Sequence, residues 1–160
     1  MKILVVSDTH GYAERLLTVR DRTGSVDVLI HAGDIEGQED YIRNIFDCPL
    51  FMVAGNNDWG SGLKRELTFR IDDFRIFLTH GNRYGVSLGT ERLLAEAEVR
   101  KADICIFGHT HRPTLFKKNN VTMMNPGSIA YPRQIGKKPT YGLIEIDENH
   151  MPGFRIEQID

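Results

Sequence analysis

Five short apolar runs in this chain each end next to side chains that can bind a metal ion. The runs span residues 3–6, 28–30, 50–53, 76–78 and 104–107. They are rich in branched and aromatic side chains, which is typical of buried strands. The residues that follow them are Asp8 and His10, Asp34, Asn56, His80, and His109 and His111. In an open sheet, ligands bind at the carboxyl ends of the strands, so the sequence predicts seven potential ligands along one edge.

The order of apolar and polar segments predicts an α/β fold. Helices are expected over 12–22 and 37–46, between the first three strands, which gives a β-α-β-α-β unit with a parallel sheet. A hairpin over 67–79, a helix over 89–101 and a β-rich last third follow, with strands expected over 114–117, 121–124, 142–146 and 154–159. We expect one domain over 1–160 with two sheets, partly antiparallel, and helices on their outer faces, because each sheet has two apolar faces to cover.

Charge and composition exclude several classes of function. A net charge of −2 offers no broad basic surface for nucleic acid. No apolar run approaches the roughly 18 residues of a membrane span, and no apolar leader follows a positively charged start, so we expect a soluble cytoplasmic protein without a membrane partner. The two cysteines form no C-x-x-C pair, and Cys105 is expected to be a small buried hydrophobe. Sequence motifs of serine hydrolases and of nucleotide-binding loops are absent.

The types of ligand favour a pair of divalent cations. An asparagine oxygen suits a hard or borderline cation but is rare in structural zinc sites, and the whole set is too large for one tetrahedral ion. Two cations about 3.5–4 Å apart bind the phosphoryl oxygens of a phosphate ester while a shared hydroxide attacks in line with the leaving group. Asp8 and His10 are expected to point the same way, because alternate residues of extended backbone do so. His109 and His111 repeat that spacing.

The ordered motifs resemble the calcineurin-like metallophosphoesterases over nearly the whole chain. They are Asp8-x-His10, Gly33-Asp34, Gly55-Asn56-Asn57-Asp58, His80-Gly81 and Gly108-His109-Thr110-His111. The short length and Asn125-Pro126-Gly127-Ser128 are similar to the small prokaryotic YfcE/MJ0936-type phosphodiesterases. The resemblance implies a four-layer αββα sandwich with a dinuclear site at the top of the sheets.

The same resemblance implies a distribution of the ligands over two ions. One ion is held by Asp8, His10, Asp34 and His111, and the other by Asp34, Asn56, His80 and His109. Asp34 is then the bridge. Manganese is the metal that we expect to serve in an assay, with iron, zinc and nickel as alternatives, because these ligand types do not choose among them.

One residue departs from the family pattern. Many relatives have a histidine at the position of Asn57, and that histidine is thought to protonate the leaving oxygen or to steady the phosphate. An amide has no proton to give, so the roughly 10²- to 10⁴-fold contribution of a general acid is missing. We therefore predict a preference for diesters or activated aryl esters over alkyl monoesters. Asp58 is expected to orient a neighbouring ligand or the asparagine.

Three further residues have two interpretations each. Arg83, three residues after His80, either reaches a phosphate oxygen of the substrate with its guanidinium or is an ordinary surface arginine. Trp59 is expected to pack within the protein more than to stack on a nucleobase. His31 is expected to be a hydrogen-bonded interior histidine rather than a ligand.

These observations favour a metal-dependent phosphoesterase, in the first place a phosphodiesterase acting on a small phosphate diester or a nucleotide-like compound. Two alternatives stay open. A nuclease of the same fold would need a basic track, which the net charge disfavours without excluding a short single strand. A non-catalytic Vps29-like interaction scaffold is disfavoured because all seven ligands are present. A homodimer is compatible with a domain of this size.

Overall fold

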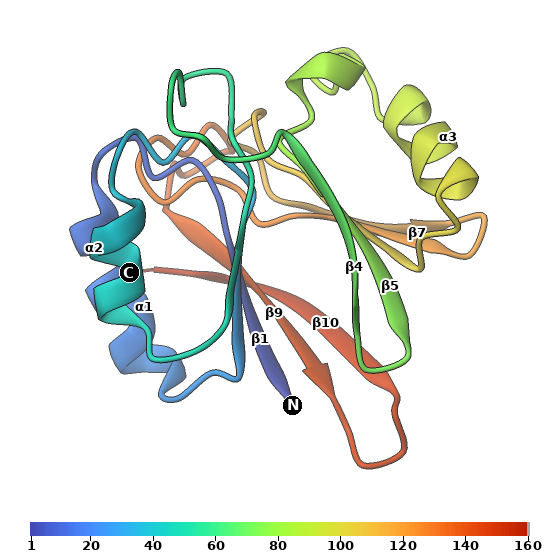
Figure 1. The fold of residues 1–160 in the computed structure, drawn as a ribbon, viewed down its shortest axis with the longest axis horizontal. Helices are drawn as coiled ribbons and strands as arrows, with labels where there is room; N and C mark the ends of the chain where they lie inside the picture. Colours follow the sequence, from blue (N-terminus) through green and yellow to red (C-terminus); the bar gives the residue numbers. More distant parts are fainter. Residues whose placement is uncertain (160) are drawn as a thin grey trace.

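Two five-stranded sheets form the centre of the protein in the computed structural model, which describes residues 1–159 (Figure 1). Asp160, the last residue of the expected domain, lies outside the described part. The first sheet has the order β10 (Pro152–Gln158), β9 (Thr140–Ile146), β1 (Lys2–Val6), β2 (Val28–His31) and β3 (Leu50–Met52). The second has the order β4 (Glu66–Ile71), β5 (Phe74–Thr79), β6 (Ile104–Ile106), β8 (Val121–Asn125) and β7 (Thr114–Lys118).

Helices cover the outer face of each sheet. Helices α1 (Leu16–Thr23) and α2 (Glu39–Ile45) pack on the first sheet, and α3 (Glu91–Val99) packs on the second, which confirms the expected αββα layers (Figure 1). Two 3-10 helices, η1 (Ala13–Arg15) and η2 (Asn82–Tyr84), precede α1 and follow β5. The helices are shorter than the sequence predicts. For example, α3 ends early because Lys101 adopts a left-handed φ of 55°.

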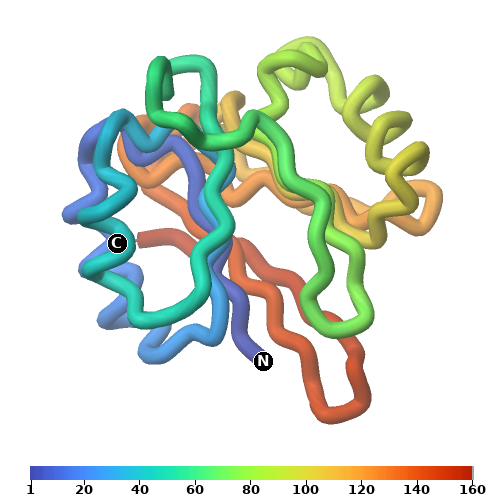
Figure 2. Tube along the Cα trace, viewed as in Figure 1, coloured from blue at the N-terminus to red at the C-terminus, as the bar shows by residue number. Residues whose placement is uncertain are grey.

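The pairing of the strands confirms the predicted mixture of directions. Strands β1, β2 and β3 are parallel to one another, as are β5, β6 and β8. Strand β9 pairs antiparallel with β1, so the C-terminal hairpin, red in Figure 2, lies beside the blue N-terminal strand. Because the registers keep the ends of neighbouring parallel strands level, the loops that follow these strands all emerge at the same end of the two sheets.

Alternation along the strands divides the core into three layers. In β1, Ile3 and Val5 point into the apolar layer between the sheets, while Leu4 and Val6 lie under α1 and α2. Cys105 is buried in the third layer, beneath α3, as expected. Within residues 1–159 no helix has both the length and the apolar character needed to cross a membrane.

The layer between the sheets should account for much of the stability. We expect Ile30→Ala, in this layer, to lower the free energy of unfolding by about 2–5 kcal/mol, because the deletion leaves a cavity that the rigid sheets cannot close. Leu88→Ala, at a side chain that is 98% exposed, should change it by less than about 0.5 kcal/mol. Urea unfolding of the metal-free protein measures both values. Equal effects of the two substitutions would contradict this account of the core.

Candidate metal centre

The structure brings all seven expected ligands together at the carboxyl ends of five strands. Loops after β1, β2 and β3 supply four of the side chains from the first sheet, and loops after β5 and β6 supply three from the second. The ligands are Asp8, His10, Asp34, Asn56, His80, His109 and His111. The centre therefore lies between the two sheets, where both sets of strand ends meet.

The local backbone at these ligands differs from the predicted one. Strand β1 ends at Val6, and Asp8 and His10 have left-handed φ values of 54° and 43°. His109 and His111 likewise have φ values of 68° and 57°. The expectation of extended backbone at these pairs is therefore wrong, although their side chains do converge. The chain turns sharply as soon as it leaves the sheet, and the loops are held by backbone bonds such as that from the Asp8 amide to the Gly33 carbonyl at 3.0 Å.

One group of ligands consists of Asp8, His10 and His111. The Nε2 atom of His111 lies 3.0 Å from Asp8 Oδ1 and 3.1 Å from His10 Nε2. On its other side the His111 ring donates from Nδ1 to the carbonyl of Tyr131 at 2.7 Å, so Nε2 keeps its lone pair. His10 Nδ1 contacts the carboxylate of Glu36 at 2.7 Å. Both rings are thus oriented by outer partners, which is the usual arrangement of histidines that bind a metal.

A second group lies around His80. This ring donates from Nδ1 to the Ala32 carbonyl at 2.7 Å and directs Nε2 to Asn56 Oδ1 at 3.1 Å and Asp34 Oδ2 at 3.4 Å. His109 Nδ1 also lies 3.0 Å from Asn56 Oδ1. Asp34 Oδ2 is 3.7 Å from the Nε2 atom of His10 in the first group. Asp34 therefore stands between the two groups of ligands.

A buried carboxylate oxygen shows that the centre suits a cation. Asp8 is fully buried, and within residues 1–159 its Oδ1 atom accepts no hydrogen bond. The Nε2 atoms of His111, His10 and His80 surround it at 3.0, 3.7 and 3.9 Å. A buried charge without a hydrogen-bond donor is costly, and a divalent cation would supply the missing partner. The nitrogen and oxygen donors present fit manganese, iron, zinc or nickel.

Asn57 holds the carboxylate of Asp34 in place. Its backbone amide donates to Asp34 Oδ1 at 2.9 Å, and its side-chain amide donates to Oδ2 at 2.8 Å. Space beside this carboxylate is limited, because a Cβ on Gly55 would lie 2.0 Å from Asp34 Oδ1. Asn57 therefore contacts a ligand directly, and Gly55 is needed for that ligand to fit.

Asp58 lies behind the centre and binds only backbone there. Its Oδ1 atom accepts from the amides of Ile35 at 2.9 Å and Glu36 at 2.7 Å, and its Oδ2 accepts from Gly55 at 2.7 Å. These three bonds join the loop after β2 to the loop after β3. Asp58 thus positions the backbone next to Asp34 and Asn56, which is compatible with the expectation that it orients a neighbouring ligand.

Several residues outside the set of ligands support the centre. Ser7 Oγ donates to Asp8 Oδ2 at 2.6 Å, and Ser128 Oγ donates to the Asp8 carbonyl at 2.9 Å. Asn125 donates from its side chain to the Gly108 carbonyl at 2.8 Å. The segment 125–128 thus contacts the loops after β1 and β6. The position of this segment after the last motif was the sequence signal for its role. For Glu36, which contacts His10, the only signal was its closeness to Asp34 in the sequence.

Burial and mutual charge set the protonation of the centre without metal. Burial acts to raise the pKa of Asp8, but the neighbouring imidazoles of His10, His111 and His80 outweigh it and hold that pKa well below its usual range. Burial acts to lower the pKa of His10, yet the carboxylates of Asp8 and Glu36 raise it to about 9. His31 is different, because burial lowers its pKa to about 4. Its hydrogen bonds to Thr9 and Gly33 confirm it as an interior histidine.

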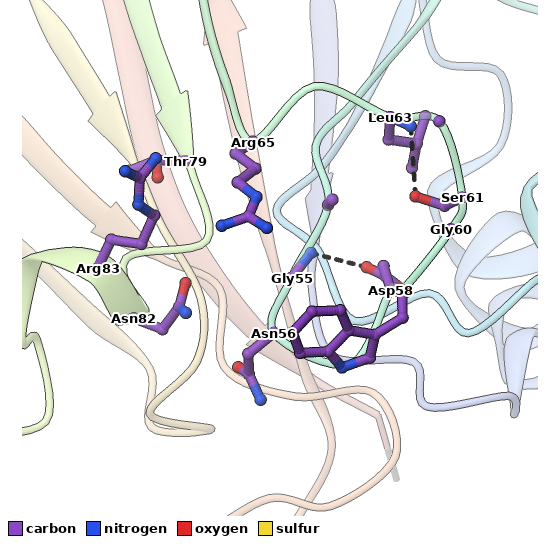
Figure 3. A pocket seen from close by; sticks show the side chains of 13 residues that line it. Gly55, Asn56, Asp58, Gly60, Ser61, Leu63, Arg65, Thr79, Asn82 and Arg83 are labelled. Atoms are coloured by element: carbon purple, nitrogen blue, oxygen red, sulfur yellow. Dashed lines mark hydrogen bonds between the residues drawn. The ribbon is translucent and has the colours of Figure 1, made fainter.

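Arg83 and Trp59 lie beside the centre rather than in it. Both line a neighbouring cavity that also reaches Asn56 and contains the unpredicted Arg65 (Figure 3). Trp59 is 84% exposed, so the expectation that it packs within the protein is wrong. Sequence position alone could not decide this, because an indole in a loop is equally compatible with either environment.

Comparison with known proteins identifies relatives along nearly the whole chain. Residues 1–149 match the family model of the calcineurin-like phosphoesterase superfamily domain. The probable metallophosphoesterase YsnB of Bacillus subtilis is 32% identical over 150 residues, which cover 93% of this chain and 86% of YsnB. The phosphodiesterase YfcE of Escherichia coli is 34% identical over 173 aligned positions, which cover 92% of this chain and 89% of YfcE.

Solved structures share the same fold. A protein from Streptococcus pneumoniae TIGR4, described as a predicted phosphoesterase, superposes with a TM-score of 0.81 at 28% identity and covers 98% of this chain and 97% of its own. Vps29 from Entamoeba histolytica, in a complex with zinc, has a TM-score of 0.76 at 24% identity and covers 99% of both chains. The second likeness shows the fold alone.

Uptake of metal by the purified protein should release protons. With a pKa of about 9, His10 is protonated in the metal-free protein at pH 7.5, and a cation can bind its nitrogen only after that proton leaves. We expect about one proton from this ring on binding of the first ion, and an affinity that rises with pH up to about 9. Isothermal titration with manganese in buffers of different ionisation enthalpy measures the release. A binding enthalpy that is independent of the buffer would contradict it.

Proposed function

The chain belongs to the calcineurin-like phosphoesterase superfamily, and on that premise we propose that it is a metal-dependent phosphodiesterase. Its substrate would be a small phosphate diester or a nucleotide-like compound, hydrolysed at a dinuclear centre. The observation that carries the proposal is the position of Asp34, whose Oδ2 atom lies 3.4 Å from His80 Nε2 and 3.7 Å from His10 Nε2. A carboxylate so placed can serve two neighbouring cations at once.

We assign the ligands to two sites that share Asp34. The first site would use Asp8, His10, Asp34 and His111, and the second would use Asp34, Asn56, His80 and His109. The cluster Asp8–His10–His111, with its ligand atoms within 4.8 Å of one another, supports the first site. The cluster Asp8–Asp34–His80 brings Asp34 to His80 of the second site, with Asp8 within the same distance. When bound, a pair of divalent cations polarises the phosphoryl oxygens and lowers the pKa of the attacking water. Manganese is our choice for assay, and iron, zinc and nickel are alternatives.

The contribution of the protein itself is to fix these side chains before the substrate arrives. His111 and His80 each donate from Nδ1 to a backbone carbonyl, which directs Nε2 inward. Asn57 holds both oxygens of Asp34, so it acts as a positioning residue through that carboxylate. Such outer contacts typically change metal affinity or activity by about 10- to 100-fold.

No general acid stands beside the leaving group in this proposal. The amide of Asn57 already donates to Asp34 and cannot give up a proton. Esters whose leaving group needs no protonation, such as aryl diesters, should therefore react best. Arg83 and Asn56 line one cavity, so a phosphate held at the centre would have a guanidinium in the adjoining space.

The two alternatives receive less support. A Vps29-like scaffold shares the fold, but a chain used only as an interaction surface would have no need for the seven convergent ligands or for the outer contacts that orient them. A nuclease would need a basic track, and the net charge of −2 offers none at the level of the whole chain. We therefore regard residues 1–160 as one catalytic domain.

Metal dependence and the role of Asp34 can be tested together. We expect the metal-free protein to hydrolyse bis-nitrophenyl phosphate only after manganese is added back. Asp34→Asn should reduce kcat/KM by more than about 100-fold, because the shared anionic ligand is lost. Asp73→Asn, the same change at a carboxylate that is 77% exposed, is the matched control and should retain activity. Full activity of Asp34→Asn, or no activity with any of the four metals, would overturn the proposal.

The missing acid predicts a steep dependence on the leaving group. Across phosphate diesters whose leaving alcohol ranges from nitrophenol through phenol to simple alkanols, the rate should fall sharply as the leaving group becomes more basic. Asn57→His should raise the rate of hydrolysis of slow substrates more than that of bis-nitrophenyl phosphate. An imidazole titrates near pH 6.5 and can therefore donate a proton to a basic leaving group. Asn57→Ala removes the side-chain contact to Asp34 Oδ2 without adding an acid, so it should lower all rates alike. A simple alkyl phosphate hydrolysed as fast as bis-nitrophenyl phosphate would show that this account of Asn57 is wrong.

A further inference from the structure

A cavity beside the metal centre carries two unpaired arginines. It has a volume of about 220 Å³ and lies between the loop 55–65 and η2. Arg65, Arg83 and Asn82 line one part of it, and Asn56 lines another part (Figure 3). Asn56 also lines the cavity of the metal centre itself, so the two spaces adjoin. We call this cavity the arginine pocket.

Neither arginine has a protein partner in the part of the chain that the structure describes. No ion pair or hydrogen bond occupies the guanidinium of Arg65 or Arg83, and neither is among the residues with further interactions. Some arginines of the protein are paired, as Arg100 is with Glu66 and Glu96 at 2.7 Å each. Two guanidiniums left unpaired at one cavity are therefore available to a ligand.

The wall of the pocket carries more positive than negative charge. Asp58 is the one acidic residue in its wall, and both of its carboxylate oxygens already accept backbone amides. Arg65 and Arg83 present planar forks of N–H donors that match the oxygens of a phosphate. Asn82 and Asn56 also line this pocket. The chemistry of the wall thus favours a phosphate group.

We propose that the arginine pocket binds a second phosphate of the substrate. The substrate class would then be a phosphodiester whose scissile group sits at the metal centre while a phosphate monoester on the same molecule sits between Arg65 and Arg83. This inference rests on the proposed function. A volume several times the roughly 30 Å³ of one water admits more than a single small ion. Trp59, exposed in the same wall, offers a ring face to a nucleobase.

A binding measurement tests the pocket without metal or turnover. Trp59 is the only tryptophan of the chain, so its fluorescence reports on the pocket. Protein treated with EDTA is titrated with inorganic phosphate. We expect saturable quenching or enhancement, with a Kd that rises at least tenfold in Arg65→Gln and in Arg83→Gln. Lys64→Gln, the same charge change at an exposed neighbour outside the pocket wall, is the matched control and should keep the Kd.

A pair of substrates tests what the pocket recognises. The nitrophenyl ester of thymidine 5′-phosphate is compared with the same ester bearing a 3′-phosphate, both with manganese present. We expect the 3′-phosphate to raise kcat/KM by at least tenfold, mainly through KM. Arg65→Gln should bring that ratio close to one, and Lys64→Gln should leave it unchanged.

The outcomes separate this inference from the proposed function. Hydrolysis of both esters with equal kcat/KM overturns the inference and leaves the proposed function standing. Phosphate binding that requires Arg65, in a protein that hydrolyses neither ester, supports the phosphate pocket and overturns the proposed function. If free phosphate binds but the 3′-phosphate brings no advantage, the pocket binds free phosphate, and the assignment to the substrate is wrong. Equal phosphate affinity in wild type and Arg65→Gln overturns the pocket itself.

Discussion

The carboxylate of Asp8 is the contact point on which the arrangement of the two sheets depends. Fully buried, it lies after β1 of the first sheet, while the histidine rings around it come from both sheets. Its Oδ2 atom accepts from Ser7 at 2.6 Å and from the His109 amide at 3.2 Å, and its Oδ1 atom faces three imidazoles. Because a buried charge is stable only when it is compensated, the ends of both sheets must stay close to this residue.

Five of the seven candidate ligands lie in strained backbone. Asp8, His10, Asp34, His109 and His111 all have left-handed φ values, although a residue with a Cβ avoids this region. Such conformations cost on the order of 1–3 kcal/mol each and persist where the surroundings determine them. Here hydrogen bonds between the loops hold these conformations, for example the bond from the His10 amide to the Asp34 carbonyl at 2.9 Å. The fold therefore uses part of its stability to hold the ligands in place.

The sequence predicts the strands and the convergence of the candidate ligands well because both depend on local pattern. Apolar runs followed by polar side chains specify buried strands and their carboxyl ends, and convergence follows from parallel pairing. Other features depend on contacts between distant segments. The left-handed turn at Asp8, the bonds of Asp58 to backbone across two loops, and the approach of Arg65 to Arg83 join residues that no local pattern relates. The exposure of Trp59 was missed for the same reason.

Charge at the site is divided between two environments that respond differently to metal. At the centre, Asp8 and Asp34 would repel an anionic substrate until cations neutralise them, so productive binding of a phosphate there must follow metal binding. The arginine pocket keeps its positive charge with or without metal, since Arg65 and Arg83 have no carboxylate partner among the described residues. A chain with a net charge of −2 can thus still attract a phosphate to one place. The two environments adjoin at Asn56, so an anion bound at the arginines would lie beside the candidate metal ligands.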